Sequence, residues 1–206
     1  MCLDKQALWG VSVAEFVAFE PGIEVNGEAI LSVIDGSTIK GVAIALLARH
    51  GIIQPRPGQW YSQQAWLNCF KEIHASIGPN TCFLIGRKIP ENAVFPADID
   101  NIEKALSSID VAYHLNHRKN GTILFDAQSG QMHEGIGHYG YERIPGRKQA
   151  HMICNNPYPC DFDRGIIDTM ARKFKPNGTL FTKVTHDDTA PCRKLGADAC
   201  TYLIEW

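Results

Sequence analysis

The sequence predicts a single-domain α+β protein in which amphipathic helices pack against an antiparallel sheet. Helical periodicity of apolar residues dominates the first half of the chain, whereas alternating apolar residues and tight turns dominate the second half. Helices that precede the strands in this way are typical of α+β domains rather than of a doubly wound parallel sheet. The 206 residues suffice for one domain with a substantial core. We therefore expect one domain over 1–206, with a mainly helical half at 1–118 and a sheet region at 120–206.

Three amphipathic helices are predicted in the first half. Ser37 is a good N-cap for the first helix, and Gly51 is suited to the position just past its end. The second helix is expected over 62–77, and the third is expected to start at Asp98. The stretch 87–96, which contains two prolines, is predicted to be a surface loop.

In the second half of the chain, the residue pattern predicts several strands and one helix between them. A β-rich stretch at 122–125 is followed by a hairpin, whose two strands are expected at 138–144 and 148–154. Asp161 is expected to cap a helix with apolar residues on one face. Strands at 179–185 and 200–206 complete the expected sheet.

Composition and charge exclude several classes of protein. Hydrophobic residues make up 45% of the chain and charged residues 20%, which is ordinary for a globular domain. The net charge of −2 and the lack of a basic run argue against nucleic-acid binding. The longest apolar stretch, 42–47, is too short to span a bilayer. The first ten residues include Asp4 and no long apolar run, so we expect no secretory signal and a cytoplasmic location.

Three of the seven cysteines are predicted to share a metal site with one histidine. Cys160 precedes the expected helix at 161. Cys192 and Cys200 are separated by seven residues with Gly196 midway, which suits a turn that brings the two sulfurs together. A helix N-terminus favours the thiolate, which is the form that binds metals. Three thiolates and the imidazole of His186 would form a closed tetrahedral shell, as in structural zinc sites. The alternative is three unrelated buried cysteines, because this spacing is not a standard zinc-knuckle motif.

The same region resembles the 4-vinyl reductase domain family over about residues 120–206. The residues that carry the resemblance are a cysteine, an aromatic residue, a glycine and two isoleucines, followed by two cysteines that flank a glycine: Cys160, Phe162, Gly165, Ile166, Ile167, Cys192, Gly196 and Cys200. The resemblance implies a fold related to TRAPP trafficking subunits and to the sensor halves of bacterial transcription activators. It also implies zinc held by the three cysteines and an acidic residue.

The acidic ligand of the family does not carry over to this chain. Its place falls near Thr189, which cannot serve as a ligand. His186, at the end of an expected strand, is the best replacement, and Asp187 and Asp188 are alternatives.

The expected function is that of a zinc-stabilised sensor or adaptor domain. The resemblance implies an apolar pocket for a small hydrophobic molecule, and we expect Trp60, Trp66 and Phe70 at its edge. Homodimerisation and a downstream signalling protein are the expected partnerships. The alternatives are a reductase or binding protein for a tetrapyrrole, or a dimeric scaffold without ligand. Catalysis is the weaker expectation, because no nucleotide-binding loop and no pair of nucleophile and base is evident.

Overall fold

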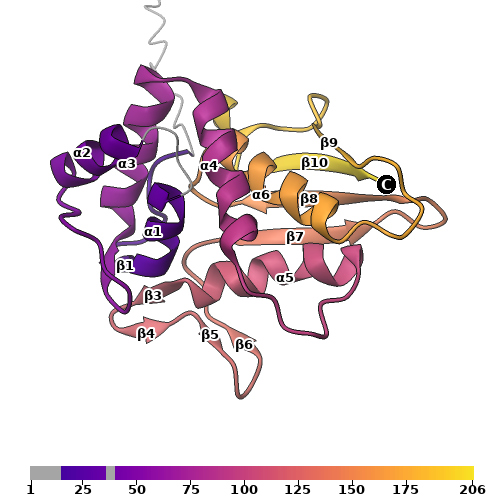
Figure 1. The fold of residues 1–206 in the computed structure, drawn as a ribbon, viewed down its shortest axis with the longest axis horizontal. Coiled ribbons are helices and arrows are strands. Elements are labelled where there is room, and N and C mark those ends of the chain that lie inside the picture. Colours follow the sequence, from indigo (N-terminus) through magenta and orange to yellow (C-terminus); the bar gives the residue numbers. More distant parts are fainter. Residues whose placement is uncertain (1–14, 36–39) are drawn as a thin grey trace, which may run out of the picture.

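The computed structural model describes residues 15–35 and 40–206, and Figure 1 shows their arrangement. The predicted N-cap Ser37 lies outside the described residues. The helices are α1 (Gly27–Asp35), α2 (Lys40–Arg49), α3 (Gln63–Ser76), α4 (Pro79–Asn92), α5 (Ile102–Leu115), α6 (Cys160–Lys173) and the short 3₁₀ helix η1 (Arg193–Leu195). The strands are β1 (Ile23–Asn26), β2 (Trp60–Ser62), β3 (His117–Lys119), β4 (Thr122–Ile123), β5 (Phe125–Asp126), β6 (Gln131–Met132), β7 (His138–Arg143), β8 (Gln149–Asn155), β9 (Lys183–His186) and β10 (Cys200–Glu205).

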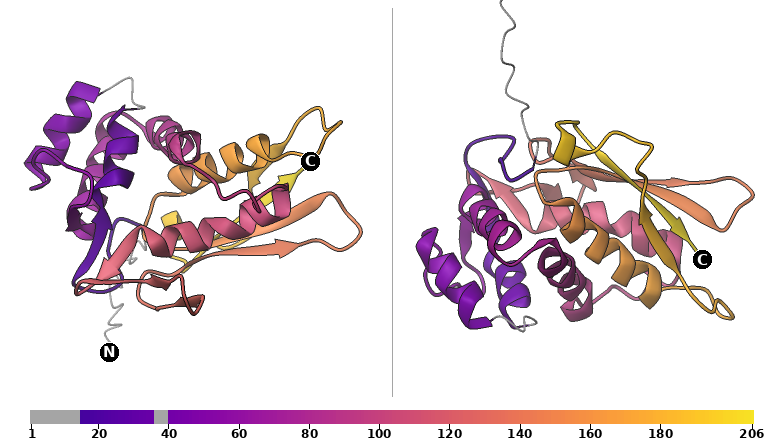
Figure 2. Two further views of the ribbon diagram at one scale, coloured as in Figure 1. Left: turned by 60° about the horizontal axis from the view of Figure 1, so that its bottom comes forward. Right: turned by 90° about the horizontal axis from the view of Figure 1, so that it is seen from above.

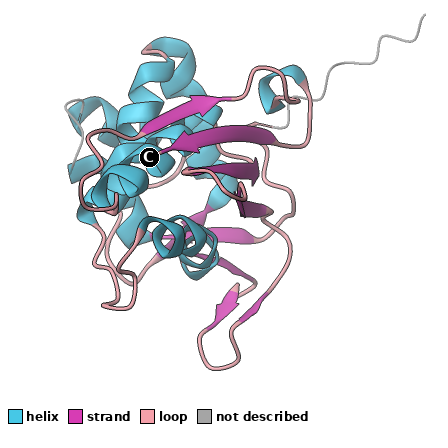
Figure 3. Cartoon of the chain, turned by 90° about the vertical axis from the view of Figure 1, so that its right-hand side faces the viewer, coloured by secondary structure: helices cyan, strands magenta, loops and turns pink. Residues whose placement is uncertain are grey.

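The larger sheet has the strand order β7-β8-β10-β9, and each neighbouring pair is antiparallel. Alternate residues of β8 and β10 are buried, so one face of this sheet belongs to the core. Helices α5 and α6 contact this sheet and each other (Figures 1 and 3). The predicted α+β class with an antiparallel sheet against helices is thus confirmed.

A second antiparallel sheet, in the order β2-β1-β3-β4, lies with α1 to α3 at the other end of the molecule. Helix α4 links the two regions, because it contacts α1 and α3 on one side and α6 on the other (Figure 2). The first and second halves of the chain therefore meet along α4. The predicted division at residues 118 to 120 stays a prediction.

Helices α4 and α6 pack unusually close together because each offers a glycine at the contact. A Cβ atom on Gly86 would overlap the carbonyl oxygen of Phe162. A Cβ atom on Gly165 would overlap the carbonyl oxygen of Phe83. Both glycines are therefore required by the close approach of two backbones.

Several predicted elements are confirmed, with shifted ends. Helix α3 begins after Ser62, whose side chain accepts a hydrogen bond from the backbone N–H of Ala65. Strands β7 and β8 form the predicted hairpin. The third predicted helix, α5, begins at Ile102 rather than at 98, because Asn101 provides the N-cap. Helix α6 begins at Cys160 itself, so the prediction that Asp161 caps it was wrong.

Two helices were not predicted. Helix α1 has nine residues and follows β1 directly, so no loop in the sequence marks where it begins. Helix α4 covers Pro79–Asn92, so the loop prediction for 87–96 was wrong over its first six residues. Pro79 stands in the first turn, where no backbone donor is needed, and Pro90 falls in the last turn.

Candidate functional site

An apolar pocket of about 410 Å³ lies where α4, α5 and α6 meet β1 and the segment after α4. Trp66, Ile109, Phe162 and Met170 are among the side chains that line its interior. Val94 and Ala112 also line it, and both are exposed, so this side forms the mouth. The volume and the apolar lining are typical of sites for small molecules.

The polar groups around the pocket are already paired with protein atoms. Tyr113 donates its hydroxyl proton to the carbonyl oxygen of Ile136, at 2.8 Å. His117 is bonded through Nδ1 to the carbonyl oxygen of Tyr113, at 2.7 Å, and its Nε2 lies 2.8 Å from the hydroxyl of Tyr158. The pocket therefore offers packing surface rather than free hydrogen-bonding groups.

His117 is buried in this wall, and burial lowers its pKa from 6.5 to about 4. Between these two pH values the unfolded chain binds a proton that the folded chain does not. We therefore expect His117 to remove about 2 kcal/mol from the free energy of unfolding as the pH falls from 6.5 to 5. Denaturant unfolding at both pH values measures this loss. His117→Gln should lose less stability over the same range, and an identical loss in both proteins would contradict the assignment.

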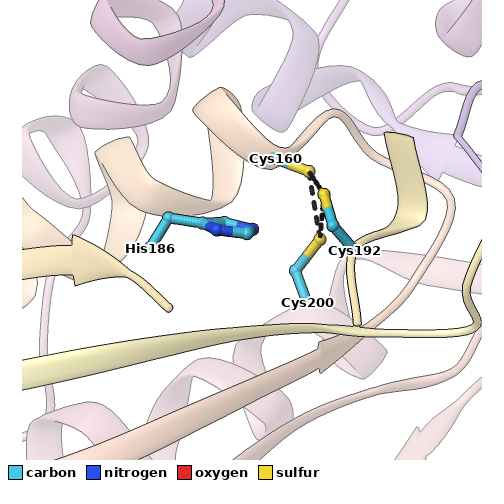
Figure 4. Close-up of side chains that lie close together, drawn as sticks. All are labelled: Cys160, His186, Cys192 and Cys200. Carbon is cyan, nitrogen blue, oxygen red and sulfur yellow. Dashed lines mark hydrogen bonds between the residues drawn. The ribbon is translucent and has the colours of Figure 1, made fainter. Parts of the chain in front are cut away.

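Three cysteines and one histidine meet beside the N-terminus of α6 (Figure 4). The Sγ atoms of Cys160 and Cys200 are 3.0 Å apart, and Cys192 Sγ lies 3.8 Å and 3.7 Å from them. The ring of His186 points toward the three sulfurs (Figure 4), and the four ligand atoms lie within 4.8 Å of one another. The structure thus brings together all four predicted metal ligands.

Local structure explains this convergence. Cys160 is the first residue of α6, and Cys192 precedes η1. Cys200 begins β10, and His186 ends β9 opposite Tyr202 of β10. Gly196 has a φ of 86°, which lets the chain reverse between the two later cysteines, as the sequence predicted.

The close pair of sulfurs polarises the two thiols in opposite directions. The neighbouring thiol of Cys160 and the guanidinium of Arg193 hold the pKa of Cys200 below its usual value. The neighbouring sulfur of Cys200, burial and the carboxylate of Glu15 raise the pKa of Cys160. Oε1 of Glu15, which is buried, lies 2.7 Å from Cys160 Sγ.

A buried ionic network joins this cluster to the pocket wall. Arg193 is fully buried, and its backbone N and its Nε each lie 3.4 Å from Cys200 Sγ. Its guanidinium forms an ion pair with Asp163 and donates to Asn156 Oδ1 at 2.7 Å. Asp163 in turn accepts a 2.6 Å hydrogen bond from Tyr139, which lines the pocket. Sequence reasoning missed this network, because nothing in the sequence distinguishes a buried arginine from an exposed one.

The three predicted pocket residues have different positions. Trp66 lines the pocket. Phe70 is fully buried behind it, with ring centroids 4.7 Å apart. Trp60 lies elsewhere, on β2, where the guanidinium of Arg118 stacks on its ring.

A second group of possible ligands comprises Asp110, His114 and His138. His114 is a buried residue of α5. Its ring lies against that of His138 on β7, with the two ring centroids 4.9 Å apart. Its Nδ1 is bonded to the carbonyl oxygen of Asp110, and its Nε2 has no hydrogen-bond partner. His114 does not line the apolar pocket.

Comparison with known proteins identifies the fold. No sequence-family model and no curated protein sequence matches the chain. An H-NOX protein from S. oneidensis superposes with a TM-score of 0.60 at 15% identity, over 87% of this chain and 95% of that protein. An oxygen-binding H-NOX domain related to soluble guanylate cyclases gives 0.55 at 15% identity, over 87% and 91%. A structure concerned with haem distortion in the H-NOX family gives 0.53 at 14% identity, over 88% and 94%.

These matches correct two predictions. The resemblance to the 4-vinyl reductase family and TRAPP subunits was wrong, because the solved structures that match are H-NOX domains. Structural zinc as the cofactor was also wrong, because the matching structures are described by Fe(II) ligation and by haem. Within the described residues, no helix is long and apolar enough to cross a membrane. The chain has the fold of H-NOX domains.

Proposed function

We propose that this protein is a sensor-type ligand-binding domain that holds a small, neutral, apolar molecule in the pocket between α4, α5 and α6. The pocket itself supports this proposal most directly, since it combines about 410 Å³ with an apolar lining and a mouth at the surface. The matching H-NOX structures, one of which is an oxygen complex, support a ligand-binding role for the fold.

Haem, the group named for the matching proteins, does not fit the residues that line this pocket. Haem iron in proteins is held by histidine, cysteine, methionine or tyrosine. His117 is the single histidine among the described lining residues, and both of its ring nitrogens are already bonded. The hydroxyls of Tyr113, Tyr139 and Tyr158 are also bonded to protein groups.

The lining also lacks a partner for the two carboxylates that haem carries. No lysine or arginine is found among the described residues that line the pocket. The thioether of Met170 is then the one lining group able to approach an iron. Buried carboxylates without a cation are strongly unfavourable, so the pocket selects against haem and for an uncharged ligand.

Naphthalene, a neutral aromatic molecule, is a suitable probe of this pocket. At a hundredfold excess over its dissociation constant it should raise the free energy of unfolding by about 2.7 kcal/mol. Denaturant unfolding with and without naphthalene measures the effect, and a titration with haemin followed by absorption spectroscopy provides the comparison. We expect no haem spectrum characteristic of an iron ligated by the protein.

The matched variants are Ala112→Trp, at the mouth of the pocket, and Ala75→Trp, on the exposed side of α3. Ala112→Trp should abolish stabilisation by naphthalene, and Ala75→Trp should leave it unchanged. Equal stabilisation of both variants would place the ligand elsewhere. Stoichiometric haem binding that Ala112→Trp blocks would instead favour the tetrapyrrole alternative.

A sensor must also transmit occupancy of its pocket to another protein. Homodimerisation and a downstream signalling partner accordingly belong to the proposal. Sedimentation velocity with and without naphthalene tests whether the protein forms a homodimer. A monomer under both conditions would contradict the proposed homodimer and the alternative of a dimeric scaffold.

A further inference from the structure

We propose that one end of the larger sheet is a docking surface for an anionic lipid membrane. The docking surface consists of segment 143–149, which contains the turn of the β7–β8 hairpin, and segment 172–183, which contains the loop between α6 and β9. Both segments lie at the end of the molecule where β10 finishes (Figures 1 and 2). The sheet register places them together, because Glu205 of β10 is paired with Gln149 on one side and with Lys183 on the other.

The charge of the docking surface is entirely positive in sequence. Its two segments contain seven basic residues and neither aspartate nor glutamate: Arg143, Arg147, Lys148, Arg172, Lys173, Lys175 and Lys183. The whole chain, in contrast, has 22 acidic residues and a net charge of −2. Three of the seven cations form ion pairs with carboxylates of other segments: Arg143 with Glu103, Arg172 with Asp168, and Lys183 with Glu205. Among the described residues, Arg147, Lys148 and Lys175 have no carboxylate partner, so their charge is available to an anion.

Two adjacent apolar side chains project from the loop between α6 and β9. Leu180 is 89% exposed and Phe181 is 72% exposed. The backbone of the loop is nevertheless held in place. The backbone N–H of Thr179 donates to the carbonyl oxygen of Pro176 at 3.0 Å, and Lys175 Nζ donates to that of Leu180 at 3.2 Å. The fold thus keeps both apolar side chains in water, where burial among acyl chains would be favourable.

Apolar side chains between cations match the surface of an anionic bilayer. Lysine and arginine are attracted to anionic headgroups, and leucine and phenylalanine enter the boundary between headgroups and acyl chains just below. A nucleic acid would also attract the cations, but it would leave the aliphatic side chain of Leu180 in water. The combination therefore favours a membrane over a nucleic acid.

The docking surface adjoins the mouth of the apolar pocket. The ring of Phe174 packs against that of Phe95, with centroids 5.1 Å apart, and Lys173 Nζ lies 4.6 Å from the centroid of the same Phe95 ring. Phe95 lines the pocket next to the exposed Val94. A docked protein would therefore hold the mouth close to apolar molecules dissolved in the bilayer. This role in ligand supply rests on the proposed function, whereas membrane binding itself does not.

Co-sedimentation of the whole chain with sucrose-loaded vesicles tests the proposal. We expect binding to phosphatidylcholine vesicles that contain about one-third phosphatidylserine, and much weaker binding to pure phosphatidylcholine. Raising the salt concentration to about 0.5 M should weaken binding, because it screens the attraction between the cations and the headgroups.

The charge is tested by a double variant, Arg147→Gln with Lys148→Gln, at the exposed turn of the hairpin. It should weaken binding to the anionic vesicles by roughly 5-fold for each charge removed. The matched control is Arg56→Gln with Lys71→Gln. These exposed cations belong to the loop before β2 and to α3, at the opposite end of the molecule (Figure 1), and their loss should have no effect.

The apolar contact is tested by Phe181→Ser, which should weaken binding by about 10-fold or more. Ile53→Ser is the matched control, because Ile53 is 69% exposed in the loop between α2 and β2. It should bind the vesicles as the unmodified protein does. All these substitutions are at exposed positions, and circular dichroism checks that each variant is folded.

Three outcomes would overturn the proposal. One is a folded protein that does not sediment with the anionic vesicles. Another is an equal loss of binding in Phe181→Ser and Ile53→Ser. The third is binding that the double variant weakens and Phe181→Ser leaves unchanged, which would show a general polyanion surface. Stabilisation by naphthalene is measured without vesicles, so the docking surface and the pocket can fail independently.

Discussion

Replacing Arg193 with methionine is expected to lower the free energy of unfolding by about 3 to 5 kcal/mol, because it leaves the buried carboxylate of Asp163 without its cation. Both side chains are fully buried, so water cannot replace the lost partner. Urea unfolding at pH 8 measures the effect. Lys194→Met is the matched control, since the ion pair of Lys194 with Asp161 is partly exposed and should contribute less than about 1 kcal/mol.

The loss of stability in Arg193→Met should depend on pH, whereas a loss caused only by poorer packing would not. Burial raises the pKa of Asp163 to about 6 even though Arg193 opposes the shift. Without Arg193 the pKa of Asp163 should rise further. At pH 5 the carboxyl group is then neutral in the folded protein, at little cost in free energy. At pH 8 the unfolded chain ionises this group freely, whereas the folded protein must either keep it protonated or bury its charge, and both cost stability. The destabilisation by Arg193→Met should therefore be smaller at pH 5 than at pH 8. Equal losses at both pH values would show that the ion pair is not the cause.

Gly165→Ala is expected to lower the free energy of unfolding by about 3 kcal/mol, at the upper end of the usual range for overpacking. The added Cβ would overlap backbone atoms of α4, which cannot rotate away as a side chain can. Helices α4 and α6 would have to separate, and both helices line the apolar pocket. Naphthalene binding should therefore weaken in the same variant. Thermal and denaturant unfolding measure the stability.

Gly41→Ala is the control for this change, because a Cβ there meets nothing within 4 Å and the residue is exposed in α2. Alanine has the higher helix propensity, so Gly41→Ala should leave stability unchanged or raise it by up to about 1 kcal/mol. Gly86→Ala, on the facing helix, should resemble Gly165→Ala. If all three variants were equally stable, the close crossing of α4 and α6 would not require glycine.

The pocket and the cysteine cluster are connected by one chain of contacts. Cys200 faces Arg193, Arg193 pairs with Asp163, and Asp163 accepts the hydroxyl proton of Tyr139 in the pocket wall. Such a network is a physical route by which the two sites can influence each other, although only a measured coupling establishes it. Stabilisation by naphthalene, compared between the unmodified protein and Arg193→Met, tests this route.

The sequence by itself determined the α+β class, the hairpin of β7 and β8, the helix predicted over 62–77 and the turn at Gly196. These features depend on periodicity and on the chemistry of single residues, which local sequence records. It also singled out three cysteines, one at a helix start and two on either side of Gly196, and offered His186, Asp187 and Asp188 as candidates for the fourth position; the structure brings His186 to the three sulfurs. The family resemblance misled, since a spacing of cysteines and glycines is shared by chains of different folds.

Tertiary structure alone decided which groups are buried together. Helix α4 was misjudged because Pro90 lies inside it, where proline removes a backbone donor and usually indicates a break. Its packing against α6, through Gly86 and Gly165, became visible only in the structure. An arginine is usually expected at the surface, and nothing in the sequence around Arg193 indicates otherwise. In the structure, its ion pair with Asp163 and its hydrogen bond to Asn156 hold it in the core. The pocket is likewise a product of packing, because its walls come from segments nearly 150 residues apart, from Val25 to Met170. A local sequence pattern cannot predict such a cavity, because the cavity forms only where segments far apart in the sequence pack without filling the space between them.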